Sequence, residues 1–86
     1  MPTTTLRIEL CGRLADACGR EVELDLPDSG LPVAALMTAL GDAYPALGEA
    51  LGRGRIRACV NEAIVPVATV VRASDQVALF PPVSGG

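Results

Sequence analysis

The sequence predicts an α+β fold in which a mixed sheet of four to five strands packs on one main helix. Three observations support this prediction. Apolar residues recur at every second position in several short segments and at helical spacing in one longer segment, and a chain of 86 residues suffices for one hydrophobic core but not for two. We therefore expect one domain over residues 1–80 and a separate C-terminal tail over residues 81–86.

The first two strands are predicted from an alternation of apolar and polar residues. Residues 6–10 place Leu, Ile and Leu on one face, with Arg and Glu between them. Residues 22–26 repeat the pattern with Val, Leu and Leu, separated by acidic residues. We expect these segments to pair as a hairpin joined by a long loop around Gly12 and Gly19.

The spacing then changes to that of a helix. One apolar stripe is formed by Val33, Leu36, Met37, Leu40 and either Ala43 or Tyr44. We expect the helix to be capped by Ser29 or Gly30 and to end before Pro45, which disfavours helical geometry in the preceding residue. Residues 47–51 predict a short further helical turn.

The C-terminal third of the chain predicts shorter strands. Residues 56–60 alternate as a third strand, and Asn61 and Glu62 predict a turn into a short fourth strand. Pro66 restricts pairing there, so this strand is expected at an edge or a break of the sheet. A last strand is predicted over residues 76–80. A hairpin, a crossing helix and further strands together describe a β-grasp fold.

Composition excludes several classes of function. The net charge is −3 and all seven cations are Arg, so no nucleic-acid partner is expected. No apolar run approaches the roughly 20 residues of a membrane span, and residues 1–5 do not resemble a signal peptide, so we expect a cytoplasmic protein without a membrane partner. The chain lacks His and Lys, the commonest general base and the Schiff-base nucleophile. An independent catalyst would have to use carboxylates or thiols.

Three cysteines lack the C-x-x-C spacing of a zinc or redox site: Cys11, Cys18 and Cys59. We expect reduced, partly buried cysteines, and the alternative is a reactive or disulfide-forming thiol. The acidic residues of 21–25 alternate without converging, so no metal site is expected. The arginines of 53–57 share one side of a predicted strand, either as a solvated face or as a basic stripe for an acidic partner.

The C-terminal tail is the main candidate for function. The last predicted strand runs almost directly into the closing segment Phe80-Pro81-Pro82-Val83-Ser84-Gly85-Gly86. A residue before proline favours extended geometry, so the stem is expected to be stiff, whereas the last three residues are flexible. Two terminal glycines occur by chance in about one chain in 200, so the diproline stem and the preceding strand supply the specificity.

Two terminal glycines suit the delivery of a carboxylate to another enzyme, because a backbone without side chains can enter a narrow channel. The carboxylate is a poor electrophile until it is activated. Adenylation by ATP would give a reactive mixed anhydride, and sulfide would convert this anhydride into a C-terminal thiocarboxylate. No residue of the chain need act as acid or base, because the activating enzyme supplies that chemistry.

The segments Val60–Val65 and Asp75–Gly86 resemble the small sulfur-carrier subunits of molybdopterin synthase, a ubiquitin-like family whose characteristic tail matches Phe-Pro-Pro-Val-Ser-Gly-Gly. The resemblance extends more loosely back to Leu6. The related thiazole-synthesis carriers also end in Gly-Gly, usually without the diproline stem. The chain departs from the family at Leu10-Cys11-Gly12, where aromatic residues followed by Ala are common.

The resemblance implies a protein that is not an enzyme alone but the small subunit of molybdopterin synthase. A ubiquitin-activating-like adenylyltransferase would use ATP to adenylate Gly86, with Gly85 beside it, and the adenylate would become a thiocarboxylate. The tail would then enter the large subunit, in a heterotetramer, and pass sulfur to cyclic pyranopterin monophosphate. No permanently bound cofactor is implied.

The residues before the terminal glycines are assigned to partner binding: Phe80, Pro81, Pro82, Val83 and Ser84. Alternation places Phe80 opposite Val77 and Leu79, and so on the outer face of the sheet, where an exposed Phe is a natural anchor for a partner. The alternative is simple packing of Phe80 in the core.

Two other functions remain open at this point. One is a sulfur carrier for another pathway, such as thiamine thiazole, cysteine or transfer-RNA thiolation, or a ubiquitin-like protein modifier attached through Gly86. The other is a β-grasp binding module whose terminal glycines have no chemistry.

Overall fold

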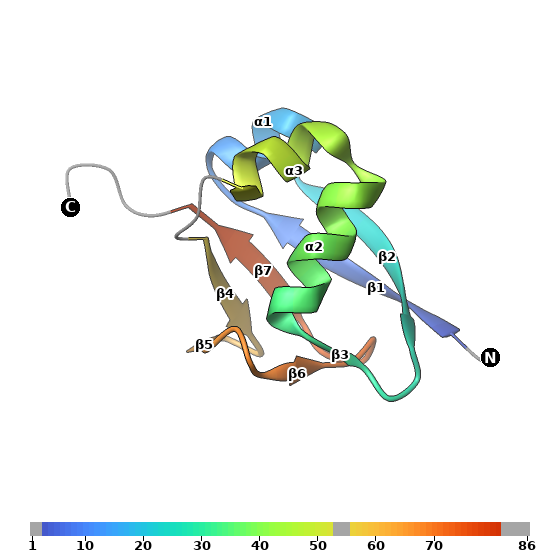
Figure 1. Ribbon diagram of the computed structural model, residues 1–86. Helices are drawn as coiled ribbons and strands as arrows, with labels where there is room; N and C mark the ends of the chain where they lie inside the picture. The colour runs from blue at the N-terminus through green and yellow to red at the C-terminus, as the bar shows by residue number, and fades with distance from the viewer. Residues whose placement is uncertain (1–2, 53–55, 82–86) are drawn as a thin grey trace.

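A computed structural model describes residues 3–52 and 56–81 of the chain (Figure 1). Its elements, in chain order, are β1 (Thr3–Leu10), α1 (Arg13–Cys18), β2 (Glu21–Pro27), β3 (Leu31–Pro32), α2 (Val33–Ala43), α3 (Pro45–Gly52), β4 (Arg57–Val60), β5 (Ala63–Val65), β6 (Val70–Val71) and β7 (Val77–Phe80). Five strands form one sheet in the order β2-β1-β7-β4-β5, and β3 pairs with β6. Helix α2 crosses one face of the large sheet (Figure 1). This arrangement confirms the predicted α+β class and is the β-grasp, or ubiquitin-like, architecture.

The large sheet is mixed because its last strand enters between the first and the fourth. Strands β1 and β2 pair antiparallel as the predicted hairpin. Strand β7 pairs parallel with β1, through Leu10 and Leu79, and antiparallel with β4, through Ala58 and Leu79. Strand β5 lies at the edge, as Pro66 predicted. The C-terminal strand is therefore hydrogen-bonded on both sides.

The hydrophobic core lies between this sheet and the helices, and it is aliphatic as the composition requires. Its buried members are Leu6, Ile8, Leu10, Leu14, Val22, Leu26, Val33, Leu36, Leu40, Leu47, Ala58, Val60, Val71, Val77 and Leu79. Burial of each larger side chain contributes about 1.5–3 kcal/mol. Within residues 3–52 and 56–81, no polar or charged residue is buried. The boundary at residue 80 stays a prediction, because residues 82–86 lie outside the described residues.

Helix α1 replaces part of the long loop that the sequence predicted between the first two strands, so that expectation is wrong. Leu14 of α1 is 1% exposed and belongs to the core, and Cys18 packs against it one helical turn later. The helix ends where the Gly19 N–H donates to the Ala15 carbonyl at 2.7 Å. Helix α1 is only six residues long, and its apolar residues anchor it on the core.

Helix α2 runs from Val33 to Ala43, as its apolar stripe predicted, but its start is satisfied differently. The expected cap by Ser29 or Gly30 is wrong, because strand β3 intervenes before the helix. The Val33 N–H donates to the Thr69 carbonyl and the Ala34 N–H to the Val67 carbonyl, both at 2.9 Å. The first free N–H groups of the helix are thus satisfied by the loop before β6, far away in sequence.

The short helical turn predicted over residues 47–51 is part of an eight-residue helix, α3. The backbones of α3 and α2 lie close together where Gly48 faces Gly41. A Cβ atom added to Gly48 would lie 2.8 Å from the Gly41 oxygen and 2.9 Å from the Gly41 Cα. The loop between the two helices also contacts the sheet, because the Tyr44 hydroxyl donates to the Glu23 carbonyl at 3.0 Å. This bond satisfies one main-chain group on the edge strand β2.

We expect Gly48→Ala to lower the free energy of unfolding by about 1–2 kcal/mol. Alanine favours a helix by about 1 kcal/mol over glycine, but the methyl group meets the backbone of Gly41 and forces α2 and α3 apart, which costs about 2–3 kcal/mol, the upper part of the usual range for overpacking. Urea denaturation measures the difference. Thr38→Ala, on the exposed side of α2, is the control and should be close to neutral. A Gly48→Ala variant as stable as the wild type would contradict the close packing.

Candidate functional site

The tail leaves the protein from the central strand of the sheet. The Leu79 carbonyl accepts a hydrogen bond from the Cys11 N–H at 3.0 Å, and Phe80 is paired with Arg57 of β4. Pro81 follows, half-buried, as the last described residue. The other predicted tail residues, Pro82, Val83, Ser84, Gly85 and Gly86, lie outside the described residues. The structure therefore fixes the point from which the tail departs.

Gly12 contacts the first residue of the tail. Its backbone has φ +58° and ψ −133°, a conformation that residues with a Cβ atom adopt only under strain. A Cβ atom at Gly12 would lie 3.2 Å from Cγ and 3.4 Å from Cδ of the Pro81 ring. The sequence predicts only a loop at Gly12, because no local pattern indicates that Gly12 and Pro81 lie close together. This glycine lets the proline pass close to the end of β1.

The side chains of β7 alternate as predicted. Val77 and Leu79 are 4% and 0% exposed on the side of the helices, whereas Ala78 and Phe80 are half-buried on the outer face. This confirms the face that alternation predicted for Phe80, but the side chain is half-buried there and not exposed as expected. Its role as a partner anchor stays a prediction.

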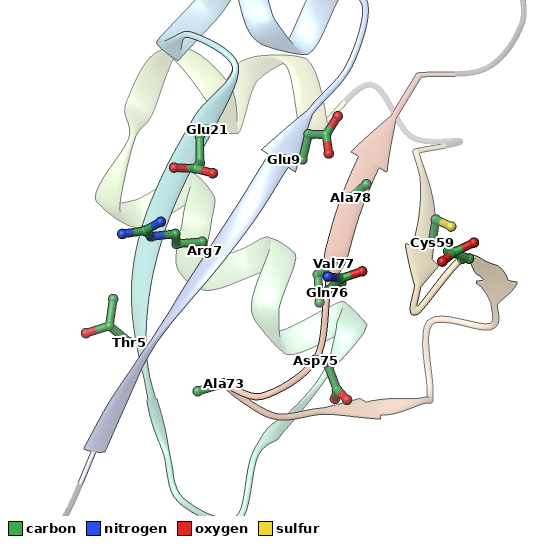
Figure 2. A pocket seen from close by; sticks show the side chains of 11 residues that line it. Thr5, Arg7, Glu9, Glu21, Cys59, Ala73, Asp75, Gln76, Val77 and Ala78 are labelled. Atoms are coloured by element: carbon green, nitrogen blue, oxygen red, sulfur yellow. The ribbon is translucent and has the colours of Figure 1, made fainter.

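One row of side chains crosses the whole outer face of the sheet. Strand pairing aligns Glu21 of β2, Glu9 of β1, Ala78 of β7, Cys59 of β4 and Ile64 of β5. An open pocket includes the first four of these residues, and α2 lies behind the sheet (Figure 2). The row is acidic at one end and ends in Ile64, which is 60% exposed, at the other.

A hydrogen-bonded turn at residues 72–75 precedes β7, and its Asp75 lines the same pocket (Figure 2). The Asp75 carboxylate accepts bonds from the Arg72 N–H at 2.8 Å and from the Asn61 side-chain amide at 3.1 Å. These two bonds hold the pKa of Asp75 below its ordinary value. Asn61 in turn accepts the Gln76 N–H at 2.9 Å. The turn between β4 and β5 is thus tied to the start of β7.

The Cys11 thiol is a poor nucleophile at neutral pH. Cys11, Cys18 and Cys59 are free and half-buried. Burial raises the pKa of the Cys11 thiol, and the nearby Glu9 carboxylate and Cys59 thiol raise it further, so Cys11 is a protonated thiol at neutral pH. Of the arginines in 53–57, only Arg57 lies among the described residues, where it is exposed.

Clusters of metal ligands and membrane-spanning helices were both looked for among the described residues. Within residues 3–52 and 56–81, no three His, Cys, Asp or Glu side chains come together as metal ligands. No helix in the same part of the chain is long and apolar enough to cross a bilayer. The geometry that the structure does offer is a tail departure point next to a polarised sheet face.

Comparison with known proteins shows the family of this chain. The sequence profile of the ThiS family matches residues 8–86. The chain belongs to the ThiS family. It is therefore a ubiquitin-like protein of the group that comprises sulfur carriers and protein modifiers, as the resemblance of its tail predicted.

The similar proteins include both a sulfur carrier and a protein modifier. The molybdopterin synthase sulfur carrier subunit of Haemophilus influenzae is 38% identical over 37 residues, a match that spans 43% of this chain and about half, 46%, of that protein. The crystal structure of SAMP1, a small archaeal modifier protein from Haloferax volcanii, is similar with a TM-score of 0.77 and 32% identity, over 96% of this chain and 100% of that one.

The fold also occurs in a two-subunit complex. The structure of subunits 1 and 2 of molybdopterin-converting factor from Helicobacter pylori contains a chain with a TM-score of 0.62 and 19% identity, over 96% of this chain and 100% of that one. At this identity the likeness extends to the fold alone.

We expect Gly12→Ala to lower the free energy of unfolding by about 1–3 kcal/mol, because the methyl group strains the backbone and meets the Pro81 ring. Gly19→Ala is the matched control: Gly19 also has a positive φ, of 90°, but nothing lies within 4 Å of its added Cβ. Both variants should lose stability in urea. Only Gly12→Ala should shift the amide NMR resonances of Leu79 and Phe80, and equal shifts in both variants would contradict the contact.

We expect Asp75→Asn to destabilise the protein at neutral pH by about 1 kcal/mol, the usual net contribution of a hydrogen bond. The folded pKa of Asp75 is lowered, so its stabilisation is present above the ordinary value of 3.8 and is lost as pH falls through the lower folded pKa. The stability difference between variant and wild type should therefore shrink in acid. Urea denaturation at several pH values measures it, with Asp28→Asn, in an exposed turn, as the charge control. A stability difference that grows in acid would contradict the lowered pKa of Asp75.

Proposed function

We propose that the chain is the sulfur carrier of molybdenum cofactor biosynthesis and the small subunit of molybdopterin synthase. The observation that carries this proposal is the departure of the tail from a central, doubly paired strand, followed by the sequence Phe-Pro-Pro-Val-Ser-Gly-Gly. The membership of the ThiS family and the similarity to the Haemophilus influenzae carrier subunit support it.

The proposed cycle uses the C-terminal carboxylate of Gly86 as the only reacting group of the chain. A carboxylate oxygen attacks the α-phosphorus of ATP and pyrophosphate leaves. Sulfide then attacks the acyl carbon of the adenylate and expels AMP, which leaves a thiocarboxylate. Neither step changes the oxidation state of carbon or sulfur. The thiocarboxylate sulfur then bonds to a carbon of cyclic pyranopterin monophosphate and displaces an oxygen from it. Water hydrolyses the resulting thioester, which leaves the sulfur on the pterin and returns the Gly86 carboxylate, so two charged carriers supply the two sulfurs of the dithiolene.

Two protein partners follow from this cycle. A ubiquitin-activating-like adenylyltransferase supplies ATP chemistry that the chain itself lacks, and the large synthase subunit accepts the charged tail in a heterotetramer. In this proposal Phe80, Pro81, Pro82, Val83 and Ser84 bind these partners, and Gly85 and Gly86 bring the carboxylate to the reacting groups. The carrier works in the cytoplasm without a permanently bound cofactor.

A second candidate function is that of a protein modifier. The similarity to the Haloferax volcanii modifier covers 96% of this chain, a larger share than the carrier match covers. In this case an amine of a target protein would attack the activated Gly86 carboxyl and form an amide. Because the sequence contains no Lys, no side-chain amine of the chain could accept a second copy.

Mass spectrometry of the intact chain tests the proposed activation. We expect incubation with the adenylyltransferase of the same genome, ATP and sulfide to exchange one oxygen for sulfur at Gly86. A chain without Gly86 should stay unmodified, and so should the wild type without ATP. A wild-type mass that does not change would reject the carrier function and leave a passive binding module.

Reconstitution with the large subunit of the same genome distinguishes the pathways. The thiocarboxylate form should convert cyclic pyranopterin monophosphate into molybdopterin, and the carboxylate form should not. Accumulation of amide conjugates in cells, without pterin sulfuration, would favour the modifier instead.

A further inference from the structure

Three segments of the chain meet where the tail leaves the domain. Strands β1 and β7 run in the same direction, and α1 follows β1 at the end of the sheet where β7 ends (Figure 1). The parallel pairing extends to Leu10 and Leu79, and the Cys11 N–H adds one more hydrogen bond, at 3.0 Å, to the Leu79 carbonyl. Two residues beyond these leucines, Gly12 of the turn between β1 and α1 lies against the Pro81 ring.

The backbone of Gly12 is held in place on both sides of this contact. The Cys11 carbonyl accepts a hydrogen bond from the Leu14 N–H at 3.2 Å, and the Gly12 carbonyl accepts one from the Ala15 N–H at 3.1 Å. Leu14 is 1% exposed in the core, so these bonds tie the turn to the folded domain. Gly12 therefore cannot move away from the Pro81 ring without disrupting the start of α1.

The Pro81 ring has little freedom of its own. Its φ angle is locked by the ring, and a proline holds the preceding residue, here Phe80, in extended geometry. Phe80 is also paired with Arg57 of β4. The direction in which the chain leaves the domain is therefore set by the half-buried Pro81 ring and by the Gly12 backbone that it meets.

A small change of this direction is amplified towards the C-terminus. If Gly12 carried a Cβ atom, the Pro81 ring would have to give way by a few tenths of an ångström. Five residues follow Pro81, and such a segment spans at most about 17 Å when it is fully extended. A turn of about 10° at Pro81 would then displace the end of an extended segment by about 3 Å. Misplacement of a reacting group by about 1 Å can lower a rate by a factor of about 100.

We propose that Gly12 is a positioning residue for the reactions of the Gly86 carboxylate. Because it lacks a side chain, the Pro81 ring packs on the turn between β1 and α1, and this packing directs the tail towards the active site of the enzyme that receives it. Gly12 itself touches no reacting atom. The proposal rests on the proposed function, because the direction of the tail affects a reaction only if the tail is activated at its end.

The test measures ATP–pyrophosphate exchange by the adenylyltransferase of the same genome, with the carrier as the varied substrate. Gly12→Ala should lower kcat by about tenfold, because fewer bound tails bring the carboxylate to ATP. Its KM for the carrier should change by less than about twofold, because the surfaces of the domain are intact. Gly19→Ala is the matched control and should keep both constants, since Gly19 lies at the other end of α1 with φ +90° and nothing within 4 Å of an added Cβ.

A second substitution separates positioning from a general effect of backbone strain. Pro81→Ala removes the ring atoms Cγ and Cδ that a methyl group at residue 12 would meet. This variant alone should lower kcat several-fold, because no ring rests on Gly12. In the Pro81→Ala background, Gly12→Ala should lower kcat further by less than about twofold, whereas backbone strain would act equally in both backgrounds.

Four results for Gly12→Ala would overturn the proposal: an unchanged kcat, an equal fall of kcat in Gly19→Ala, a change confined to KM, or an equal effect in the two backgrounds. Circular dichroism at the assay temperature shows which variants are folded. If Gly12→Ala does not fold, Pro81→Ala decides the question, because an unchanged kcat of this variant would also overturn the proposal. Failure of the proposed function is distinct, because the wild type would then support no pyrophosphate exchange at all.

Discussion

The pairing of β7 between β1 and β4 is the interaction on which the rest of the structure depends. It joins the N-terminal hairpin to the C-terminal strands, and it buries Val77 and Leu79 against the helices. The same pairing turns Ala78 and Phe80 to the outer face and fixes where the tail begins. The site and the core are therefore two faces of one strand, and a change that loosens β7 affects both stability and presentation of the tail.

The surroundings of β7 strengthen its position at each end. At its start, Asp75 and Asn61 tie the preceding turn to the turn between β4 and β5. At its end, Cys11 donates a hydrogen bond to Leu79, and Gly12 leaves room for the Pro81 ring. Since the chemistry of a carrier lies in its last residue, accurate placement of the departure point is the main contribution that the folded domain can make.

The sequence predicts those parts of the fold that depend on local patterns. Alternation at residues 6–10 and 22–26 predicts the hairpin, and the stripe from Val33 to Leu40 predicts α2. The parts that it misses depend on distant contacts. The start of α2 is satisfied by carbonyls of Thr69 and Val67, more than thirty residues away, so a search for a local cap could not find it.

Helix α1 is a different case, because its apolar residues Leu14 and Cys18 are spaced for one helical face and the short segment could have been recognised. For the site, alternation predicts the face of Phe80 correctly. The contact of Gly12 with Pro81 and the pairing of Glu9 with Glu21 need the three-dimensional register, since each joins residues from separate elements. The chemistry proposed for the tail rests on its sequence and on the family, because residues 82–86 lie outside the described residues.

The double pairing of β7 also has a mechanical consequence. An enzyme that pulls the tail along the axis of the strand loads the hydrogen bonds to β1 and β4 in shear, so that they share the force and must break together. A strand at the edge, pulled sideways, would open one bond at a time. A tail that leaves from such a strand can therefore be pulled by an enzyme, and released again, while the domain behind it stays folded.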